Sequence, residues 1–436
     1  MSARLALRGD LLDLQAQPAR AQPQDPAVRL RRDHWLLIED GRIVGAQAAA
    51  PDASWQRIDH AGRLILPGFI DTHVHSAQLD VIGSWGAQLL DWLQTYTFPA
   101  EQRCADPAYA QHSAGAFLDA LLAHGSTSAV VFPTVHAASV DALFEAAQAR
   151  GMRVISGKVL MDRNAPAALC DTVDLAERDC EALIGRWHGR GRLAYAVSPR
   201  FAPTSSDAQL ALAGRLLARH PGLYLQTHVA ENRAEAQWVA ELFPRARSYV
   251  DVYERFGLLG ARTLLAHAIW IDAADRALLQ ARGAQLAHCP SSNLFLGSGL
   301  FDWAAAADAG VPVSLATDVG GGTSLSMVRT LAAAYQLQAL AGTRLSAWAL
   351  LHAATRGAAQ ALGLAGEIGS LDAGTLADVC VWDWAVGTVA QRRQQLARDP
   401  HEQLFAWLTL ADERCLVETY VAGRRRWRRG DGRCDG

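Results

Sequence analysis

The sequence has no long apolar run. Of its 436 residues 50% are hydrophobic, yet no uninterrupted apolar stretch approaches the roughly 20 residues that span a bilayer. Charged residues break up the apolar residues of the first fifteen positions, so we expect no export signal and no transmembrane helix. A membrane is therefore not an expected partner, and the chain is long enough for one barrel-sized domain with a smaller companion.

The chain also has little net charge and no paired cysteines. A formal charge of −3 provides no basic field that would attract nucleic acid, so small molecules or further copies of the chain are the expected partners. The seven cysteines are scattered and form no CxxC pair, which argues against a disulfide framework and against a thiolate metal site. These features favour a reducing, cytoplasmic location.

What the sequence does contain is a series of eight short segments rich in β-branched and apolar residues. They occupy residues 65–71, 126–132, 153–161, 193–201, 223–231, 263–270, 284–290 and 312–319. Between most of them lie alanine- and leucine-rich stretches with helical periodicity, such as residues 139–152. Eight strands that alternate with helices predict an α/β fold, a (β/α)8 TIM barrel, with active groups at the C-terminal ends of the strands.

The two ends of the chain have a different pattern. Residues 34–46, 373–383 and 415–429 look like short antiparallel strands joined by Asp-Gly and Ala-Gly turns. We expect them to pair into a small β-sandwich domain built from both termini, with residues 1–66 and 371–436 in this domain and 67–370 in the barrel. The basic run RRRWRR within the last segment is short and terminal, and we interpret it as a solvated edge strand rather than a nucleic-acid site.

Two histidines, His73 and His75, stand two positions apart after the first strand segment. Residues i and i+2 of a strand point to the same face, so both imidazoles would project into the barrel mouth and could share a metal. A chance pairing on a half-exposed strand is the alternative. Three further residues argue against it because they too stand at strand ends: His228, His267 and Asp318. Borderline divalent metals prefer imidazole and carboxylate ligands, so these residues together predict a catalytic metal site.

Two other features lie near strand ends. His288, in AHCPSSN, is interpreted as forming a hydrogen bond that shapes the loop rather than as a metal ligand. Residues 318–326, DVGGGTSLS, look like a glycine-rich anion site but lack the GK[ST] ending. We expect these glycines instead to let the backbone bend close to the metal site.

Several motifs, taken in order, resemble the amidohydrolase superfamily. They are PGFIDTHVHSAQ, HVAENRAE, AHAIWIDAADRALL, GAQLAHCPSSNLFLGSG, LATDVGGG and ATRGAAQALGLAGEIGSLDAGTLADVCVWD, and the resemblance covers about residues 35 to 430. Residues 89–103 and 198–206 are similar to the guanine deaminase branch. The resemblance implies hydrolysis of guanine to xanthine and ammonia by a metal-activated water, in purine catabolism or salvage. It also implies a mononuclear zinc site, with Fe²⁺ as the alternative metal, and a cytoplasmic homodimer.

The same resemblance implies roles for individual residues. The implied metal ligands are His73, His75, His228 and Asp318. His267 would be either a further ligand or a partner of the activated water, and Asp318 would also help to orient that water. Glu231 would carry protons between the water, the ring nitrogen beside C2 and the departing ammonia. For Glu231 the alternative is an exposed acid in the charged run ENRAE.

Specificity is expected from the residues that face the purine, which include Glu231. Arg200 offers only donors, which match the O6 acceptor of guanine and mismatch the amino group that adenine carries there. Gln78 offers an acceptor and donors for the N1–H and C6=O edge, Phe201 could stack on the ring, and Asn293 is a further candidate contact. The alternatives are a structural salt bridge for Arg200 and an ordinary core position for Phe201.

Two other functions compete with guanine deamination. A related hydrolase that acts on a pterin, an 8-oxopurine or a triazine would need the same metal site. A non-catalytic barrel that serves as an assembly protein would not need it, and the full set of implied ligands argues against that reading.

Overall fold

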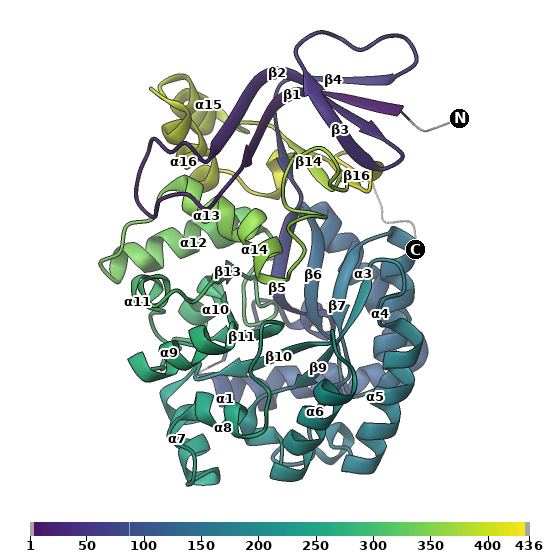
Figure 1. Ribbon diagram of the computed structural model, residues 1–436, viewed down its shortest axis with the longest axis vertical. Helices are drawn as coiled ribbons and strands as arrows, with labels where there is room; N and C mark the ends of the chain where they lie inside the picture. Colours follow the sequence, from purple (N-terminus) through teal and green to yellow (C-terminus); the bar gives the residue numbers. More distant parts are fainter. Residues whose placement is uncertain (1–3, 87, 432–436) are drawn as a thin grey trace.

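A computed structural model of the chain describes residues 4–86 and 88–431 and shows two parts, one above the other (Figure 1). The upper part is a sheet whose strands come from both ends of the sequence, purple and yellow in the figure. The lower part is a barrel surrounded by helices. A small β domain built from both termini was thus predictable, and its limits at residues 66 and 371 remain predictions.

The upper sheet has seven strands in the order β16-β15-β14-β4-β1-β2-β3. Their bounds are β1 Arg4–Leu14, β2 Val28–Glu39, β3 Arg42–Gln47, β4 Gln56–Pro67, β14 Val379–Trp382, β15 Leu416–Val421 and β16 Arg424–Arg428. The hairpins β2–β3 and β15–β16 are antiparallel, as the turns predicted, and β16 is an exposed edge strand. β1 and β4 pair in parallel, which requires the crossover connection over residues 48–55 between β3 and β4.

The lower sheet forms a barrel of parallel strands, in the order β5-β6-β7-β9-β10-β11-β12-β13, with β8 paired to β9. Their bounds are β5 Phe69–His75, β6 Ser126–Phe132, β7 Arg153–Ser156, β8 Val159–Leu160, β9 Leu193–Pro199, β10 Tyr224–Val229, β11 Thr263–His267, β12 Gln285–His288 and β13 Val313–Leu315. Backbone hydrogen bonds close the ring beyond β13, from Asp318 N to His73 O (2.9 Å) and from His75 N to Val319 O (2.8 Å). The predicted (β/α)8 barrel is confirmed.

One predicted strand has the wrong limits. The sequence predicts a single strand over residues 65–71, whereas β4 of the upper sheet ends at Pro67 and β5 of the barrel begins at Phe69. The chain passes between the two sheets at Gly68, where an added Cβ would lie 2.2 Å from Thr127 Oγ1, so only glycine fits there. Both flanking segments are apolar and buried, so their residue pattern does not mark the boundary.

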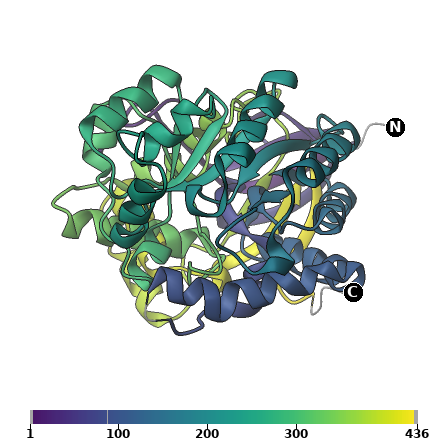
Figure 2. The same ribbon diagram turned by 90° about the horizontal axis from the view of Figure 1, so that it is seen from below.

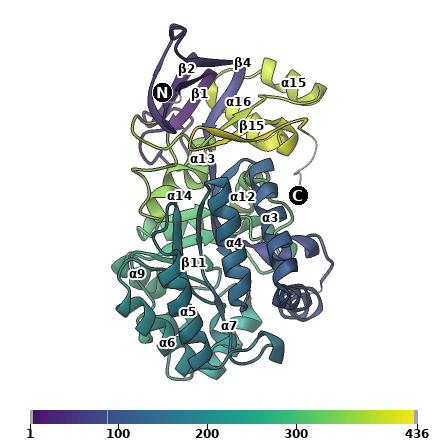
Figure 3. The ribbon, with the colours of Figure 1, turned by 90° about the vertical axis from the view of Figure 1, so that its right-hand side faces the viewer.

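Helices surround the barrel (Figure 2). Their bounds are α1 Leu89–Trp92, α2 Phe98–Gln102, α3 Pro107–Ala123, α4 Ala137–Arg150, α5 Val173–Trp187, α6 Asp207–Arg219, α7 Arg233–Leu242, α8 Tyr249–Arg255, α9 Ala273–Arg282, α10 Pro290–Phe295, α11 Trp303–Asp308, α12 Met327–Leu340, α13 Ala347–Ala354, α14 Arg356–Ala361, α15 Thr388–Gln395 and α16 Pro400–Leu410. Several begin at a capping side chain, such as Asp106 before α3 and Ser206 before α6. α15 and α16 lie beside the upper sheet (Figure 3).

Two sequence-level expectations concern membranes and thiols. Within residues 4–86 and 88–431, the helices are too short or too polar to cross a bilayer. The six cysteines in those ranges are all free thiols, and Cys434 lies outside the described residues.

Candidate active site

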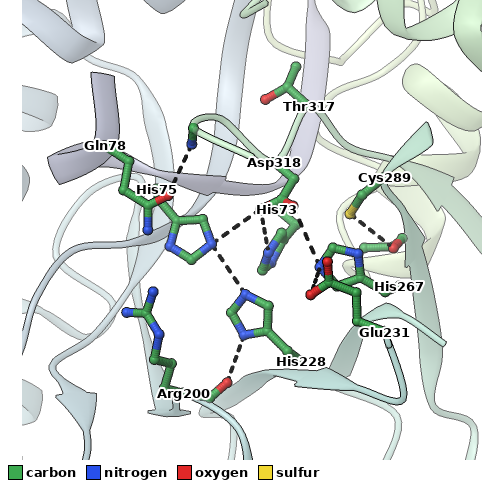
Figure 4. Close-up of polar contacts among 12 residues, drawn as sticks. His73, His75, Gln78, Arg200, His228, Glu231, His267, Cys289, Thr317 and Asp318 are labelled. Carbon is green, nitrogen blue, oxygen red and sulfur yellow. Dashed lines mark hydrogen bonds and ion pairs between the residues drawn. The ribbon is translucent and has the colours of Figure 1, made fainter. Parts of the chain in front are cut away.

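Four of the predicted residues meet at the C-terminal mouth of the barrel. His73 and His75 belong to β5, His228 to β10, and Asp318 follows β13 (Figure 4). His75 Nε2 lies 3.2 Å from both Asp318 Oδ1 and His228 Nε2. His73 Nε2 lies 3.2 Å from the same carboxylate oxygen, and one donor atom of each residue lies within 4.8 Å of the others. Residues from three strand ends, up to 245 positions apart, thus form one cluster.

The nitrogen atoms of this cluster are arranged for a cation. His228 Nδ1 donates to the backbone carbonyl of Arg200 at 2.7 Å, which leaves the Nε2 lone pair directed at the cluster. His75 Nε2 lies 3.2 Å from His228 Nε2. Two nitrogen ligands of a tetrahedral zinc ion, each about 2.0–2.1 Å from the metal, lie about 3.3 Å from one another, so the observed separation suits a shared ion. His73 Nε2 is buried, and its contact with the Asp318 carboxylate at 3.2 Å lacks the geometry of a hydrogen bond. The donor set therefore fits a divalent metal.

The protonation states of these residues also suit a metal. Desolvation lowers the pKa of His73 and lowers that of His75 to about 4. Desolvation and the neighbouring imidazoles of His73 and His75 hold the pKa of His228 well below its usual value. Burial acts to raise the pKa of Asp318, but the imidazoles of His73 and His75 hold it well below its usual value. Neutral imidazoles and an ionised carboxylate are the forms that bind metal.

His267, at the end of β11, faces the same cluster with a defined tautomer. Its Nδ1 lies 2.9 Å from Asn293 Oδ1, and because the amide oxygen accepts, Nδ1 carries the proton. The free Nε2 lies 3.5 Å from Asp318 Oδ2 and 3.4 Å from Glu231 Oε2. Asn293 thus orients His267, and its contact with the substrate stays a prediction. His267 and Asp318 have positive φ angles of 70° and 50°. This backbone conformation is strained in residues other than glycine, and it is found most often at functional sites.

A second donor group overlaps the first and includes Cys289 together with His73, His267 and Asp318. Burial and the carboxylates of Asp318 and Glu231 hold the pKa of the Cys289 thiol well above its usual value. The thiol therefore stays protonated, and it is the thiolate that binds metal. The group of three imidazoles and one carboxylate is the better candidate site.

Glu231 lies in the loop after β10 and is buried, so the exposed-acid alternative is wrong. Ser298 Oγ donates to its Oε1 at 3.0 Å. Burial and the nearby Asp318 raise the pKa of Glu231 to about 8. Its backbone N–H donates at 2.9 Å to Glu235, whose carboxylate also caps the start of α7. A carboxyl group with a raised pKa beside the metal donors suits proton transfer.

A pocket opens beside the donor cluster and contains the predicted substrate-facing residues. It is lined by His75, Gln78, Leu89, Trp92, Leu93, Arg200, Phe201, His228, Glu231, Leu296, Asp318 and Gly321. Phe201 also packs in an apolar cluster with Trp92 and Leu296, so it is both a pocket wall and a core residue. Arg200 lines the pocket and also forms a buried salt bridge with Glu101, so the salt-bridge alternative is confirmed and the contact with a purine stays a prediction.

Four buried polar residues support the site without having been assigned a role from the sequence: Asp71, Glu101, Glu235 and Ser298. The Asp71 carboxylate accepts hydrogen bonds from the backbone N–H groups of His73 and Thr317, which links β5 to the segment that carries Asp318. Burial raises its pKa to about 7. The capping-box pattern of an Asn followed three positions later by a Glu is the one sequence signal that points to Glu235.

The glycine run after Asp318 lies against the site, as expected from the sequence. An added Cβ at Gly320 would lie 2.7 Å from the carbonyl oxygen of Gln78, and one at Gly322 would lie 1.7 Å from that of Thr317. Only a residue without a side chain allows the backbone to bend this closely.

The interpretation of His288 is wrong. Neither ring nitrogen has a hydrogen-bond partner among the described residues. The ring stacks on Phe301 with the centroids 4.6 Å apart and meets Trp303 edge-on. Burial lowers the pKa of His288 to about 3, so the neutral ring packs as an aromatic core residue.

Comparison with known proteins agrees with this geometry. Residues 64–426 match the amidohydrolase family. Guanine deaminase of Escherichia coli is 41% identical over 425 residues, which cover 96% of this chain and 97% of that protein. A solved structure of E. coli guanine deaminase has a TM-score of 0.93 at 40% identity and covers 98% of this chain and 100% of that one. Guanine deaminase from C. acetobutylicum, solved with guanine bound in the active site, has a TM-score of 0.87 at 27% identity and covers 97% and 99%. The chain belongs to the amidohydrolase family.

Proposed function

We propose that this chain hydrolyses guanine to xanthine and ammonia. The observation that carries the proposal is that one pocket beside the donor cluster is lined by three of its members, by Glu231 and by the donor groups of Arg200 and Gln78. The similar proteins support it, because the E. coli relative at 41% identity is a guanine deaminase and the C. acetobutylicum structure holds guanine in its active site.

We propose that one zinc ion per chain, with Fe²⁺ as the alternative, binds to His73, His75, His228 and Asp318. Such an ion lowers the pKa of water toward about 7, which makes water a nucleophile at neutral pH. Asp318 Oδ2 and His267 Nε2, 3.5 Å apart, would orient this water. His267 is then a partner of the water rather than a fifth ligand.

Glu231 is proposed to move the protons. Its carboxylate takes one proton from the attacking water and passes it to the ring nitrogen beside C2 as the new C2–O bond forms. The same carboxylate then takes the remaining proton from that oxygen and passes it to the amine on C2. The C2–N bond breaks, the C2=O bond forms, and ammonia leaves xanthine behind. The raised pKa of Glu231, about 8, suits a group that must both accept and donate near neutral pH.

The proposed function is tested by ammonia release from a panel of substrates. Guanine should be hydrolysed with a kcat/KM at least about 10² higher than that of a pterin, an 8-oxopurine or a triazine, because buried donors left unpaired by the wrong substrate are penalised. Faster turnover of a pterin or a triazine would favour the related-hydrolase alternative. A metal-loaded protein that releases no ammonia from any of these compounds would favour the assembly-protein alternative.

Arg200→Lys tests recognition of the purine. Lysine keeps the positive charge beside Glu101 but loses the planar fork of donors. We expect kcat/KM for guanine to fall by about 10–100-fold, which corresponds to about 1.5–3 kcal/mol for a charge-assisted hydrogen bond, with no change in metal content. Arg219→Lys, at an exposed arginine paired with Glu177 and Glu181, is the matched control and should behave as wild type. An Arg200→Lys variant that hydrolyses guanine as well as the parent would make Arg200 purely structural.

We further propose that the chain works as a cytoplasmic homodimer. The support for both statements is the resemblance to guanine deaminases, and the free thiols of the described cysteines agree with a reducing compartment. Sedimentation of the purified protein at micromolar concentration would measure the oligomeric state.

A further inference from the structure

Two of the substrate-facing side chains share one buried partner. Glu101, on α2, is 0% exposed. Arg200 Nη1 donates to both of its carboxylate oxygens at 2.8 Å, and Gln78 Nε2 donates to its Oε1 at 2.9 Å. Figure 4 shows Gln78 and Arg200 on the same side of the donor cluster, next to His75. One carboxylate therefore connects the two groups from which purine recognition is expected.

The contact with Glu101 leaves the Gln78 amide with a single orientation. Its Oε1 accepts the backbone N–H of Gly320 at 3.1 Å, while its Nε2 donates to Glu101. A rotation by 180° would place the amide oxygen against the carboxylate and the NH2 group against the N–H of Gly320, which are two repulsive contacts. The amide then has one N–H and one lone pair left for the pocket.

Glu101 constrains Arg200 in the same way. Nη1 uses both of its hydrogens on the carboxylate, and the guanidinium lies over the ring of Phe98, 5.4 Å from its centroid. Among the described residues no partner of Nε or Nη2 is found, so their donors remain for a purine acceptor. Arg200 is 3% exposed, and a charge so deeply buried needs its counter-charge.

We propose that Glu101 is a positioning residue that makes the pocket selective for an oxo group over an amino group at C6 of the purine. The inference rests on the proposed function. Because the carboxylate takes up the donors that point away from the substrate, it holds a fork of donors and a singly oriented amide against the purine edge. Without that negative charge the guanidinium of Arg200 loses its buried counter-charge and the Gln78 amide loses one of the two contacts that fix it, so the donors that match a 6-oxo group are held less firmly.

The test compares guanine with 2,6-diaminopurine, which has the same amino group at C2 but an amino group at C6. In Glu101→Gln we expect KM for guanine to rise about 10–100-fold with a smaller change in kcat. The ratio of kcat/KM for guanine to that for 2,6-diaminopurine should fall at least tenfold, while metal content is unchanged. A Glu101 that serves only stability would lower the amount of folded protein without changing this ratio.

Three further variants make the test decisive. Glu177→Gln, at a half-buried glutamate on α5 that pairs with Arg215 and Arg219, is the control and should leave KM and the ratio unchanged. In a Gln78→Ala background, Glu101→Gln should reduce the ratio less than it does in the wild type, because only the effect through Arg200 remains. If Glu101→Gln does not fold, Glu101→Asp, which keeps the charge on a shorter side chain, should show the same fall to a smaller extent.

The outcomes separate this inference from the proposed function. A wild-type protein that does not hydrolyse guanine overturns the proposed function and the inference with it. An active wild type whose folded, metal-loaded Glu101→Gln or Glu101→Asp variant keeps the parental KM and ratio overturns the inference alone. A variant whose kcat falls while its KM and its ratio of kcat/KM values stay at the parental values also overturns the inference alone.

Discussion

Glu231→Gln is expected to lower kcat for guanine by about 10²–10⁴, the usual contribution of a positioned acid–base group, while metal content and guanine affinity stay close to those of the parent. Glutamine keeps the shape of the side chain and an oxygen that can accept from Ser298, but an amide cannot accept and return a proton at neutral pH. The loss corresponds to about 2.7–5.4 kcal/mol of transition-state stabilisation. Single-turnover formation of xanthine, elemental analysis and direct binding of guanine on one preparation would measure all three quantities.

The control for this variant is Glu241→Gln, the same change at an exposed position on α7, the helix that follows the Glu231 loop. It should be as active as the wild type. Unchanged turnover in Glu231→Gln would make Glu231 a bystander and would leave the proton transfers to His267 or Asp318. Loss of metal together with activity would mean that Glu231 supports the metal ligands instead.

His228→Ala is expected to lose both the metal and the activity. The wild-type protein should contain about one zinc or iron ion per chain, and the variant should retain less than about a tenth of an ion, because one of four ligands and its share of the binding free energy are removed. Ammonia release should fall by about 10³-fold or more, since water without a bound metal keeps its pKa near 15.7 instead of about 7. Elemental analysis and the ammonia assay on the same sample provide both numbers.

His112→Ala is the matched control, since His112 is an exposed histidine on α3 and its removal should change neither quantity. Two ions per chain in the wild type would show that the overlapping group with His267 and Cys289 also binds metal, and the mononuclear proposal would then be wrong. A wild type that contains no metal, even after incubation with zinc, would contradict the metal site altogether.

The barrel was predictable because its strands and helices have different periodicities that are visible in the residues themselves. Segments such as 126–132 and 193–199 are buried along their whole length, and continuous burial is typical of parallel strands covered by helices. The border between the two sheets was not predictable in the same way. Residues 65–71 form one apolar pattern, and the separation at Gly68 depends on the close approach of Thr127, a residue 59 positions further along the chain.

The candidate metal ligands were predictable for a related reason. In a parallel barrel all strands end at the same rim, so histidines and an aspartate at strand ends must converge whatever their separation in sequence. The residues that support these candidate ligands, such as Glu101, have no comparable local signal in the sequence. Glu101 lies in a short helix between two barrel strands, and its role depends on side chains 23 and 99 positions away. His288 stands at a strand end like the candidate metal ligands, yet its ring faces Phe301 and Trp303.

By itself the sequence therefore determined the barrel, the pairing of both termini in one small β domain, and the residues that could bind a metal and move a proton, because periodicity and position at a strand end are local properties. The tertiary structure decided which tautomer His267 adopts, that Glu231 is buried with a raised pKa, and that one carboxylate orients both Gln78 and Arg200. Such properties depend on burial and on partners contributed by distant segments, and both exist only after the chain has folded.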